Sequence, residues 1–332
     1  MTKTKKIIIA LCVIIPVIAC CAFTAVSHLV FDRSVMASLN EIYLGAANKD
    51  VIFETEEDFA EKITDEKNKQ LSGENYEIPE KLKLSVSAEY KTKHGMQVYY
   101  LNKAELNKSD TVVFYLHGGS FINEITKEHW KLIDFLAEKT GHPFIVPLYP
   151  RLPLYSCEDA CQALMALYKN TAKKDNIKHI YFVGDSSGGT LALSLAKQLR
   201  AEKINQPEKL VLISPWLDLT MKNKDIASLE SKDSLLGFYG LKTLGKMWAD
   251  KRAVTNPTVS PIFSRDEKLG EITIFASEKE ILYPDILKYS ESLKRQKIEH
   301  QLITEKGLSH CYVLYNTPEA KQAKAKIAEI IL

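Results

Sequence analysis

Short apolar runs alternate with longer stretches of helical periodicity from about residue 84 to the C-terminus. The pattern predicts strands over residues 112–116, 144–148, 181–183, 210–213, 272–275 and 300–303. It predicts helices over residues 127–139, 158–173, 187–200 and 284–295. Residues 84–90 and 97–101 are expected to form an antiparallel pair at one edge of the sheet. Alternation of strand and helix predicts an α/β fold, with a mostly parallel central sheet flanked by helices on both faces.

The N-terminus carries a different pattern. Residues 7–26 contain no charge and follow Lys3, Lys5 and Lys6. A helix of that length spans roughly 30 Å, the thickness of the hydrocarbon core of a bilayer. We therefore predict a transmembrane or signal-anchor segment within residues 1–31, with the rest of the chain outside the cytoplasm because the lysines precede the span.

Two alternatives remain for this segment. The sequence Ala25-Val26-Ser27 has the small residues of a signal-peptide cleavage site, which would release a secreted protein. The sequence Val17-Ile18-Ala19-Cys20 is similar to a lipoprotein cleavage box, which would leave a protein anchored by lipid at Cys20.

Composition narrows the class of protein. The chain has 332 residues, of which 45% are hydrophobic and 26% charged, and its net charge is +2. This is the composition of a globular protein, and it lacks the positive excess expected of a nucleic-acid partner. Outside the apolar N-terminal run only Cys157, Cys161 and Cys311 remain, an odd number that does not indicate a disulfide framework.

The first chemical motif is Gly184-Asp185-Ser186-Ser187-Gly188, between a predicted strand and a predicted helix. A G-x-S-x-G sequence in this setting is typical of a nucleophile elbow, whose tight turn exposes the serine hydroxyl at a helix N-terminus. We predict that Ser186 is a catalytic nucleophile.

The second motif is His117-Gly118-Gly119-Ser120-Phe121, directly after the strand predicted at residues 112–116. Glycines let backbone N–H groups approach a substrate oxygen closely. The predicted oxyanion hole consists of the N–H groups of Gly118 and Gly119, joined by that of Ser187.

A serine nucleophile needs a base, and the base needs an orienting carboxylate. We predict His310 as the base, since it follows the last predicted strand, whereas His300 lies at the start of that strand. For the acid, the loop after the strand predicted at residues 272–275 offers Glu278, Glu280 and Asp285. We choose Glu280, because Asp285 directly follows Pro284 and has the position of a first-turn helix residue.

From about residue 110 onward the chain resembles the hormone-sensitive-lipase-like group of α/β-hydrolase esterases, the fold-3 group. The resemblance rests on the two glycine motifs, on the segments 146–153 and 214–220, and on Gly307-Leu308-Ser309-His310. The chain departs from the family pattern at Ser120, usually glycine, at Ser187, usually alanine, and at Glu280, usually aspartate. The resemblance implies an α/β-hydrolase fold with a helical cap over the active site and no metal or organic cofactor.

Together these features predict three regions: the N-terminal segment 1–31, a polar helical linker and cap contribution over 32–83, and a catalytic domain over 84–332 with a cap insertion at about 220–258. The predicted function is hydrolysis of short- or medium-chain carboxylic esters, with a small-molecule or lipid ester as substrate. The alternatives are a membrane-anchored deacetylase of cell-envelope polymers and a non-catalytic ligand-binding hydrolase fold. The sequence does not specify an oligomeric state.

Overall fold

The computed structural model describes the backbone of residues 3–47 and 56–332, and the side chains of residues 15–47 and 56–332. Its centre is one sheet in the order β1-β2-β4-β3-β5-β6-β7-β8. The strands are β1 (Ala88–Lys93), β2 (Met96–Leu101), β3 (Thr111–Leu116), β4 (Phe144–Pro147), β5 (His179–Asp185), β6 (Lys209–Ile213), β7 (Glu271–Ser277) and β8 (His300–Glu305). Strand β2 pairs antiparallel with both β1 and β4, and the pairs from β4 through β8 are parallel.

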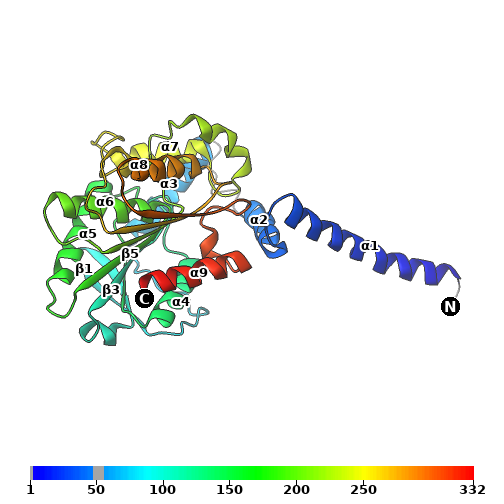
Figure 1. Cartoon of the computed structure of the whole chain (residues 1–332), viewed down its shortest axis with the longest axis horizontal. Coiled ribbons are helices and arrows are strands. Elements are labelled where there is room, and N and C mark those ends of the chain that lie inside the picture. The colour runs from blue at the N-terminus through cyan, green and yellow to red at the C-terminus, as the bar shows by residue number, and fades with distance from the viewer. Residues whose placement is uncertain (1–2, 48–55) are drawn as a thin grey trace.

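Helices cover both faces of the sheet (Figure 1). The α-helices of the described residues are α1 (Lys3–Leu29), which does not cover the sheet, and α2 (Val35–Ala47), α3 (Glu56–Leu71), α4 (Lys127–Thr140), α5 (Cys157–Ala172), α6 (Ser187–Ala201), α7 (Phe238–Ala249), α8 (Tyr283–Arg295) and α9 (Pro318–Ile331). Successive side chains of β3 point to opposite faces of the sheet and pack into two different hydrophobic cores. Val112 and Phe114 join the core that contains α5, α6 and α8, whereas Val113 and Tyr115 join the core with α4 and α9.

The predicted α/β fold is confirmed. All six strands and all four helices predicted after residue 110 are present, each within a few residues of its expected bounds. The antiparallel pair also forms, with β1 at the sheet edge, although it begins at Ala88 rather than at residue 84.

The regions predicted to contribute to a cap each contain helices. Residues 32–83 contain α2 and α3, and residues 220–258 contain α7 together with two 3₁₀ turns, η2 (Lys224–Ser228) and η3 (Glu230–Lys232). The domain boundaries themselves stay a prediction.

Helix α1 leads away from the rest of the molecule (Figure 1). Among the residues whose side chains are described, we find no helix that combines the length and the apolar character needed to cross a membrane. Residues 7–14 of the predicted segment lie outside those residues. The prediction of a membrane span over 7–26 therefore finds no support in the structure.

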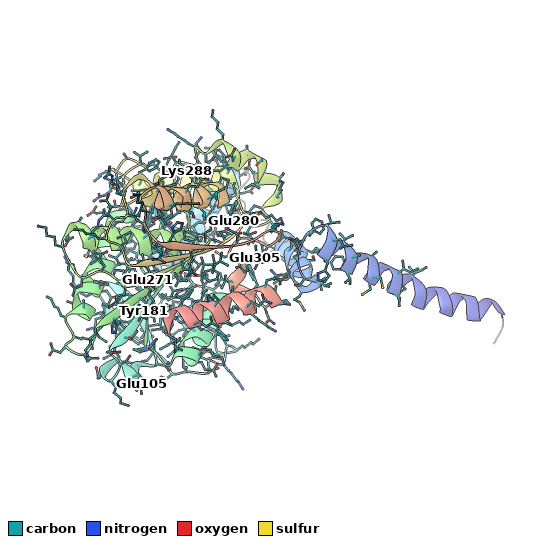
Figure 2. All side chains as sticks on the ribbon, viewed as in Figure 1. Glu105, Tyr181, Glu271, Glu280, Lys288 and Glu305 are labelled. Carbon is teal, nitrogen blue, oxygen red and sulfur yellow. The ribbon has the colours of Figure 1, made fainter. Side chains whose placement is uncertain are left out.

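The carboxyl ends of the parallel strands lie on the side of the sheet nearest α2. Figure 2 shows Glu305, at the end of β8, and Glu280, just after β7, on the side of the sheet near α2, with Glu271 and Tyr181 farther from it. The loops that leave these carboxyl ends carry the predicted site residues, as expected for an open parallel sheet.

Candidate active site

Ser186 occupies a sharp turn between β5 and α6. Its backbone has φ 51° and ψ −120°, a left-handed conformation that non-glycine residues rarely adopt, and its N–H donates to the carbonyl of Ile213 at 2.8 Å. The turn is close-packed: a Cβ at Gly184 would lie 2.6 Å from the carbonyl oxygen of Gly188, and one at Gly188 would overlap the carbonyl oxygen of Leu116. The strand–turn–helix setting predicted for Ser186 is confirmed.

The structure brings Ser186, His310 and Glu280 together. The Nε2 atom of His310 lies 3.0 Å from Ser186 Oγ, and its Nδ1 atom lies 2.5 Å from Glu280 Oε2. All three side chains are buried. Burial by itself disfavours the protonated imidazole, but the hydrogen bond and the charge of Glu280 outweigh it and raise the pKa of His310 above its ordinary value. The arrangement can pass a proton from a hydroxyl to an imidazole whose cationic form a carboxylate stabilises.

The neighbouring carboxylates have other partners. Asp285 accepts a hydrogen bond from Asn223 Nδ2 at 2.9 Å, and burial raises its pKa to about 6. Glu278 accepts from the Thr304 hydroxyl at 3.2 Å. Glu280 also accepts from the N–H of Ser277 at 3.1 Å, which fixes its carboxylate. Of the carboxylates considered from the sequence, Glu280 is the one that contacts His310.

The loop 117–121 reaches the elbow, but not in the way the sequence predicted. The N–H of Gly118 donates to Asp185 Oδ1 at 3.1 Å, so this group is occupied and cannot serve a substrate oxygen. The prediction for Gly118 is therefore wrong. Gly119 and Ser120 line the cavity beside Ser186, and Ser120 has φ 54°, the left-handed conformation for which the family uses its third glycine.

Ser187 occupies the first position of α6, where its N–H is free of the helical ladder. Its hydroxyl accepts from the N–H of Phe121 at 3.3 Å, so the serine found in place of the family's alanine also holds the loop. The structure thus brings Gly119, Ser120 and Ser187 around Ser186.

Sequence reasoning missed Asp185. This buried carboxylate accepts from the Tyr115 hydroxyl at 2.7 Å and lies 3.0 Å from His129 Nε2, in addition to its bond with Gly118. Burial opposes its ionisation, yet His129 and these hydrogen bonds hold its pKa below the usual value. Its place inside the elbow motif was the only available signal, and a motif does not reveal which strand and helix a side chain will face.

Asp233 was missed as well. It belongs to the segment predicted as cap, and it accepts hydrogen bonds from the N–H groups of Leu235, Leu236 and Ile281 at 2.9–3.0 Å. Since Ile281 follows Glu280, Asp233 joins the cap segment to the loop that carries the acid.

Ser186 and His310 open into a cavity of about 1090 Å³. One wall is apolar and comes from α2 and the cap segment, with Leu44, Leu235 and Leu236. From the N-terminal polar segment, α2 supplies Asn40, Tyr43, Leu44 and Ala47 to the lining.

Two polar contacts attach the start of α2 to the loops of the site. Arg33 Nη1 donates to the carbonyl of Gly307 at 2.7 Å, three residues before His310. Glu41 forms an ion pair with Lys279, which precedes Glu280, and lies 3.5 Å from Arg33. The segment that precedes the sheet therefore braces both loops that hold the histidine and the acid.

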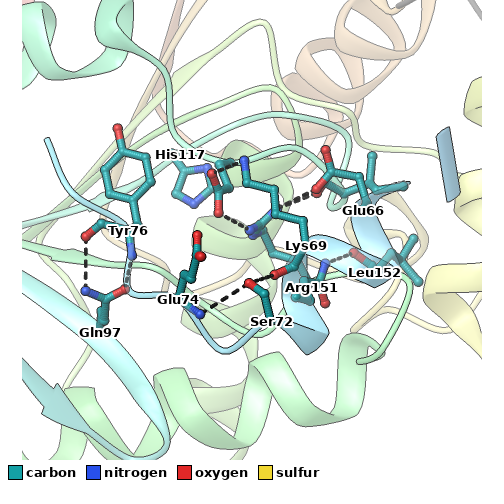
Figure 3. Close-up of polar contacts among 12 residues, drawn as sticks. Glu66, Lys69, Ser72, Glu74, Tyr76, Gln97, His117, Arg151 and Leu152 are labelled. Carbon is teal, nitrogen blue, oxygen red and sulfur yellow. Dashed lines mark hydrogen bonds and ion pairs between the residues drawn. The ribbon is translucent and has the colours of Figure 1, made fainter. Parts of the chain in front are cut away.

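Helix α3 is attached in a similar way to the loop after Gly119 (Figure 3). Arg151 donates to the carbonyl of Ile122 and forms an ion pair with Glu124 at 3.2 Å, and Lys69 of α3 pairs with Glu124 at 2.6 Å. Glu66 of α3 lies 3.9 Å from Arg151. This network fixes the far end of the glycine loop.

Within the part of the chain that the structure describes, no group of three or more His, Cys, Asp or Glu side chains is arranged to hold a metal ion. Cys157 and Cys161 are buried free thiols, and burial raises the pKa of each.

Comparisons with known proteins agree with this geometry. Residues 113–314 match the alpha/beta hydrolase fold family. The chain is 30% identical over 222 residues to an esterase of Acinetobacter venetianus, a match that covers 66% of this chain and 73% of the relative. It is 26% identical to a carboxylesterase/phospholipase of Mycobacterium tuberculosis, over 66% of this chain and 61% of that one.

Solved structures show the same fold. A Staphylococcus aureus protein to which an esterase function has been attributed superposes with a TM-score of 0.79 at 26% identity, covering 84% of this chain and 94% of that one. An esterase of the bacterial hormone-sensitive lipase family superposes with a TM-score of 0.69 over 82% of this chain and 96% of that one, and at 19% identity it supports the fold alone.

The chain belongs to the α/β-hydrolase fold family, in its fold-3 group. It is a carboxylesterase. The comparisons do not support the two alternatives, an envelope-polymer deacetylase and a non-catalytic binding protein.

Proposed function

We propose that the protein hydrolyses carboxylic esters through an acyl-enzyme formed on Ser186, with His310 as general base and acid and Glu280 as the orienting carboxylate. The observation that carries this proposal is the continuous contact from Ser186 Oγ to His310 at 3.0 Å and from His310 to Glu280 at 2.5 Å.

In the first half of the reaction, His310 Nε2 takes the proton of the Ser186 hydroxyl as its oxygen attacks the ester carbonyl. The tetrahedral intermediate collapses when His310 returns that proton to the leaving alcohol. Water then attacks the acyl-enzyme with the same base, and the acid product leaves. Glu280 stabilises the imidazolium that forms in each half-reaction, because it accepts the Nδ1–H bond.

The N–H groups of Gly119, Ser120 and Ser187 are the proposed donors to the oxyanion. This revises the set predicted from the sequence, since Ser120 replaces Gly118. Backbone donors preorganised in this way are each worth roughly 100- to 1000-fold in rate.

Short- or medium-chain esters are the proposed substrates. The support is the size of the cavity, about 1090 Å³, together with its apolar wall of Leu44, Leu235 and Leu236.

The test is hydrolysis of p-nitrophenyl esters, from acetate to palmitate, by the full chain and its Ser186→Ala variant. We expect turnover that the substitution abolishes while the circular dichroism spectrum stays unchanged, with a maximum at short or medium chains. Near wild-type turnover by Ser186→Ala would refute the assignment. Labelling of Ser186 by a fluorophosphonate, located by peptide mass spectrometry, is an independent readout.

We also propose that residues 7–26 anchor the chain to the cell membrane with its catalytic part outside the cytoplasm. The support is the uncharged run that follows Lys3, Lys5 and Lys6. Fractionation of cells and carbonate extraction, with the full chain and a variant lacking residues 1–29, is the test. Recovery of the full chain in the soluble fraction would refute the anchor, and the mass of the mature protein reports cleavage or lipidation at Cys20.

A further inference from the structure

The cavity that contains Ser186 has a second wall of different character. Lys127 and Lys131 line it from α4, and Lys321 and Lys324 line it from α9. Helices α4 and α9 lie side by side against the same face of the sheet (Figure 1), so that the four lysines line the cavity from two elements far apart in sequence.

Among the described side chains, most of this positive charge has no carboxylate partner. Glu128 lies 3.8 Å from Lys127, and Glu124 is already engaged by Lys69 and Arg151. Among the side chains the structure describes, no carboxylate lies within ion-pair distance of Lys131, Lys321 or Lys324. Asp185, the other acid of the lining, is bound to His129 and Gly118.

Lys324 is the member closest to the interior. It is half-buried, and its Nζ donates at 2.9 Å to the carbonyl of Tyr315, which also lines the cavity. Burial, reinforced by repulsion from Lys131 and Lys321, lowers the pKa of Lys324 to about 8. Such crowding of like charges costs free energy in the empty protein, and a bound anion would remove that cost.

We propose that Lys131, Lys321 and Lys324 form a binding subsite for an anionic group of the substrate, so that the preferred substrates are esters that carry a carboxylate, phosphate or sulfate apart from the scissile carbonyl. This inference rests on the proposed function of Ser186. The apolar wall of α2 and the cap segment holds the hydrocarbon part of such an ester, and the lysine wall holds its charge.

Matched pairs of soluble esters test the subsite. For an anion on the acyl part, 4-nitrophenyl hemiglutarate is compared with its methyl-capped counterpart, 4-nitrophenyl methyl glutarate. For an anion on the alcohol part, 1-butyryl-glycerol 3-phosphate is compared with monobutyrin. We expect the protein to prefer the anionic member of at least one pair, and the preference to weaken with added salt.

The lysine dependence is measured with the double variant Lys321→Gln/Lys324→Gln. We expect kcat/KM for the preferred anionic ester to fall about 5-fold or more, through KM, with little change for its neutral counterpart. Lys326→Gln is the matched control, since Lys326 lies on the same helix, pairs with Glu329 at 3.2 Å and does not line the cavity.

Three results would overturn the proposal: no preference for either anionic ester, an equal loss of kcat/KM for charged and neutral esters in the double variant, or the same selective loss in Lys326→Gln. Lysine-dependent binding to phosphatidylglycerol vesicles without any preference among the soluble esters would also overturn it, in favour of attraction to a membrane surface. Hydrolysis of neutral esters that depends on Ser186 separates failure of this subsite from failure of the proposed function.

Discussion

The carboxylate of Asp185 accepts a hydrogen bond from the backbone N–H of Gly118 at 3.1 Å, and this contact joins the nucleophile turn to the glycine loop. Asp185 precedes Ser186, and Gly118 precedes Gly119. A buried acid therefore fixes the position of the nucleophile turn relative to the proposed oxyanion donors.

The substitution Asp185→Asn tests this relationship. An amide cannot accept from Tyr115, Gly118 and His129 together with the strength of a carboxylate, so we expect the glycine loop to shift and kcat to fall by about 10-fold to 100-fold. Steady-state kinetics with a p-nitrophenyl ester provide the measurement. The exposed Asp175→Asn serves as control, and a kcat for Asp185→Asn within 2-fold of the wild type, on the order of experimental error, would contradict the bracing role.

If Glu280 and not Asp285 is the orienting acid, removing the charge of Glu280 should reduce activity much more than removing the charge of Asp285. Glu280→Gln removes the charge that stabilises protonated His310, and we expect kcat to fall by roughly 100-fold or more. Asp285→Asn alters only a contact with Asn223 and is expected to be mild. A larger loss in Asp285→Asn than in Glu280→Gln would move the acid role to Asp285.

The pH dependence follows from the same contact. His310 must be neutral to accept a proton, and its pKa is raised by Glu280, so activity is expected to fall as the pH drops through that raised pKa. In Glu280→Gln the pKa of His310 falls, and the acidic limb of the kcat/KM profile should move to lower pH. An acidic limb that stays in place, or moves to higher pH, would show that Glu280 does not control the imidazole.

Arg33 and Lys306 offer a test of how the N-terminal segment supports the site. The Arg33 side chain is only 8% exposed and donates to Gly307, so Arg33→Ala should lower the free energy of unfolding by about 1–3 kcal/mol and reduce kcat through the loop of His310. Lys306 lies 3.9 Å from Asp32, and both side chains are 70% exposed, so Lys306→Ala should cost less than about 1 kcal/mol. Urea denaturation and kinetics of both variants check the contrast. Equal effects would show that Arg33 is an ordinary surface residue.

Substitution by alanine is expected to have opposite effects on stability at two glycines, Gly188 and Gly45. A Cβ at Gly188 would overlap the carbonyl oxygen of Leu116, so Gly188→Ala should destabilise the fold by more than about 3 kcal/mol or prevent folding. A Cβ at Gly45, inside α2, would find Ser234 no closer than 4.0 Å, and Gly45→Ala should stabilise the protein by about 0.5–1 kcal/mol. Thermal denaturation compares them, and comparable midpoints would refute the close approach of the elbow to β3.

Much of the fold and of the site could be predicted before any coordinates, because the relevant signals are local. Strand and helix periods reveal the alternating elements, and the segment of glycines around Ser186 reveals a turn between two of them. Glu280 and His310 follow from the order of strands along the chain. Each of these inferences depends on residues within one element and the loop after it.

Other features of the site depend on which helices and strands pack against each other. Gly118 was assigned as an oxyanion donor from its motif, but its N–H faces Asp185, and only the pairing of β3 with β5 brings those two residues together. Asp233, Arg33 and Lys324 carry no motif at all. Their roles arise from long-range packing of the cap segment, α2 and α9, and a hydrogen bond between residues as far apart as Arg33 and Gly307 leaves no periodic trace along the chain. The sequence by itself thus determined the fold and indicated the residues proposed to react. The tertiary structure decided which backbone donors, braces and charges surround them, because those depend on distances between elements that no local pattern encodes.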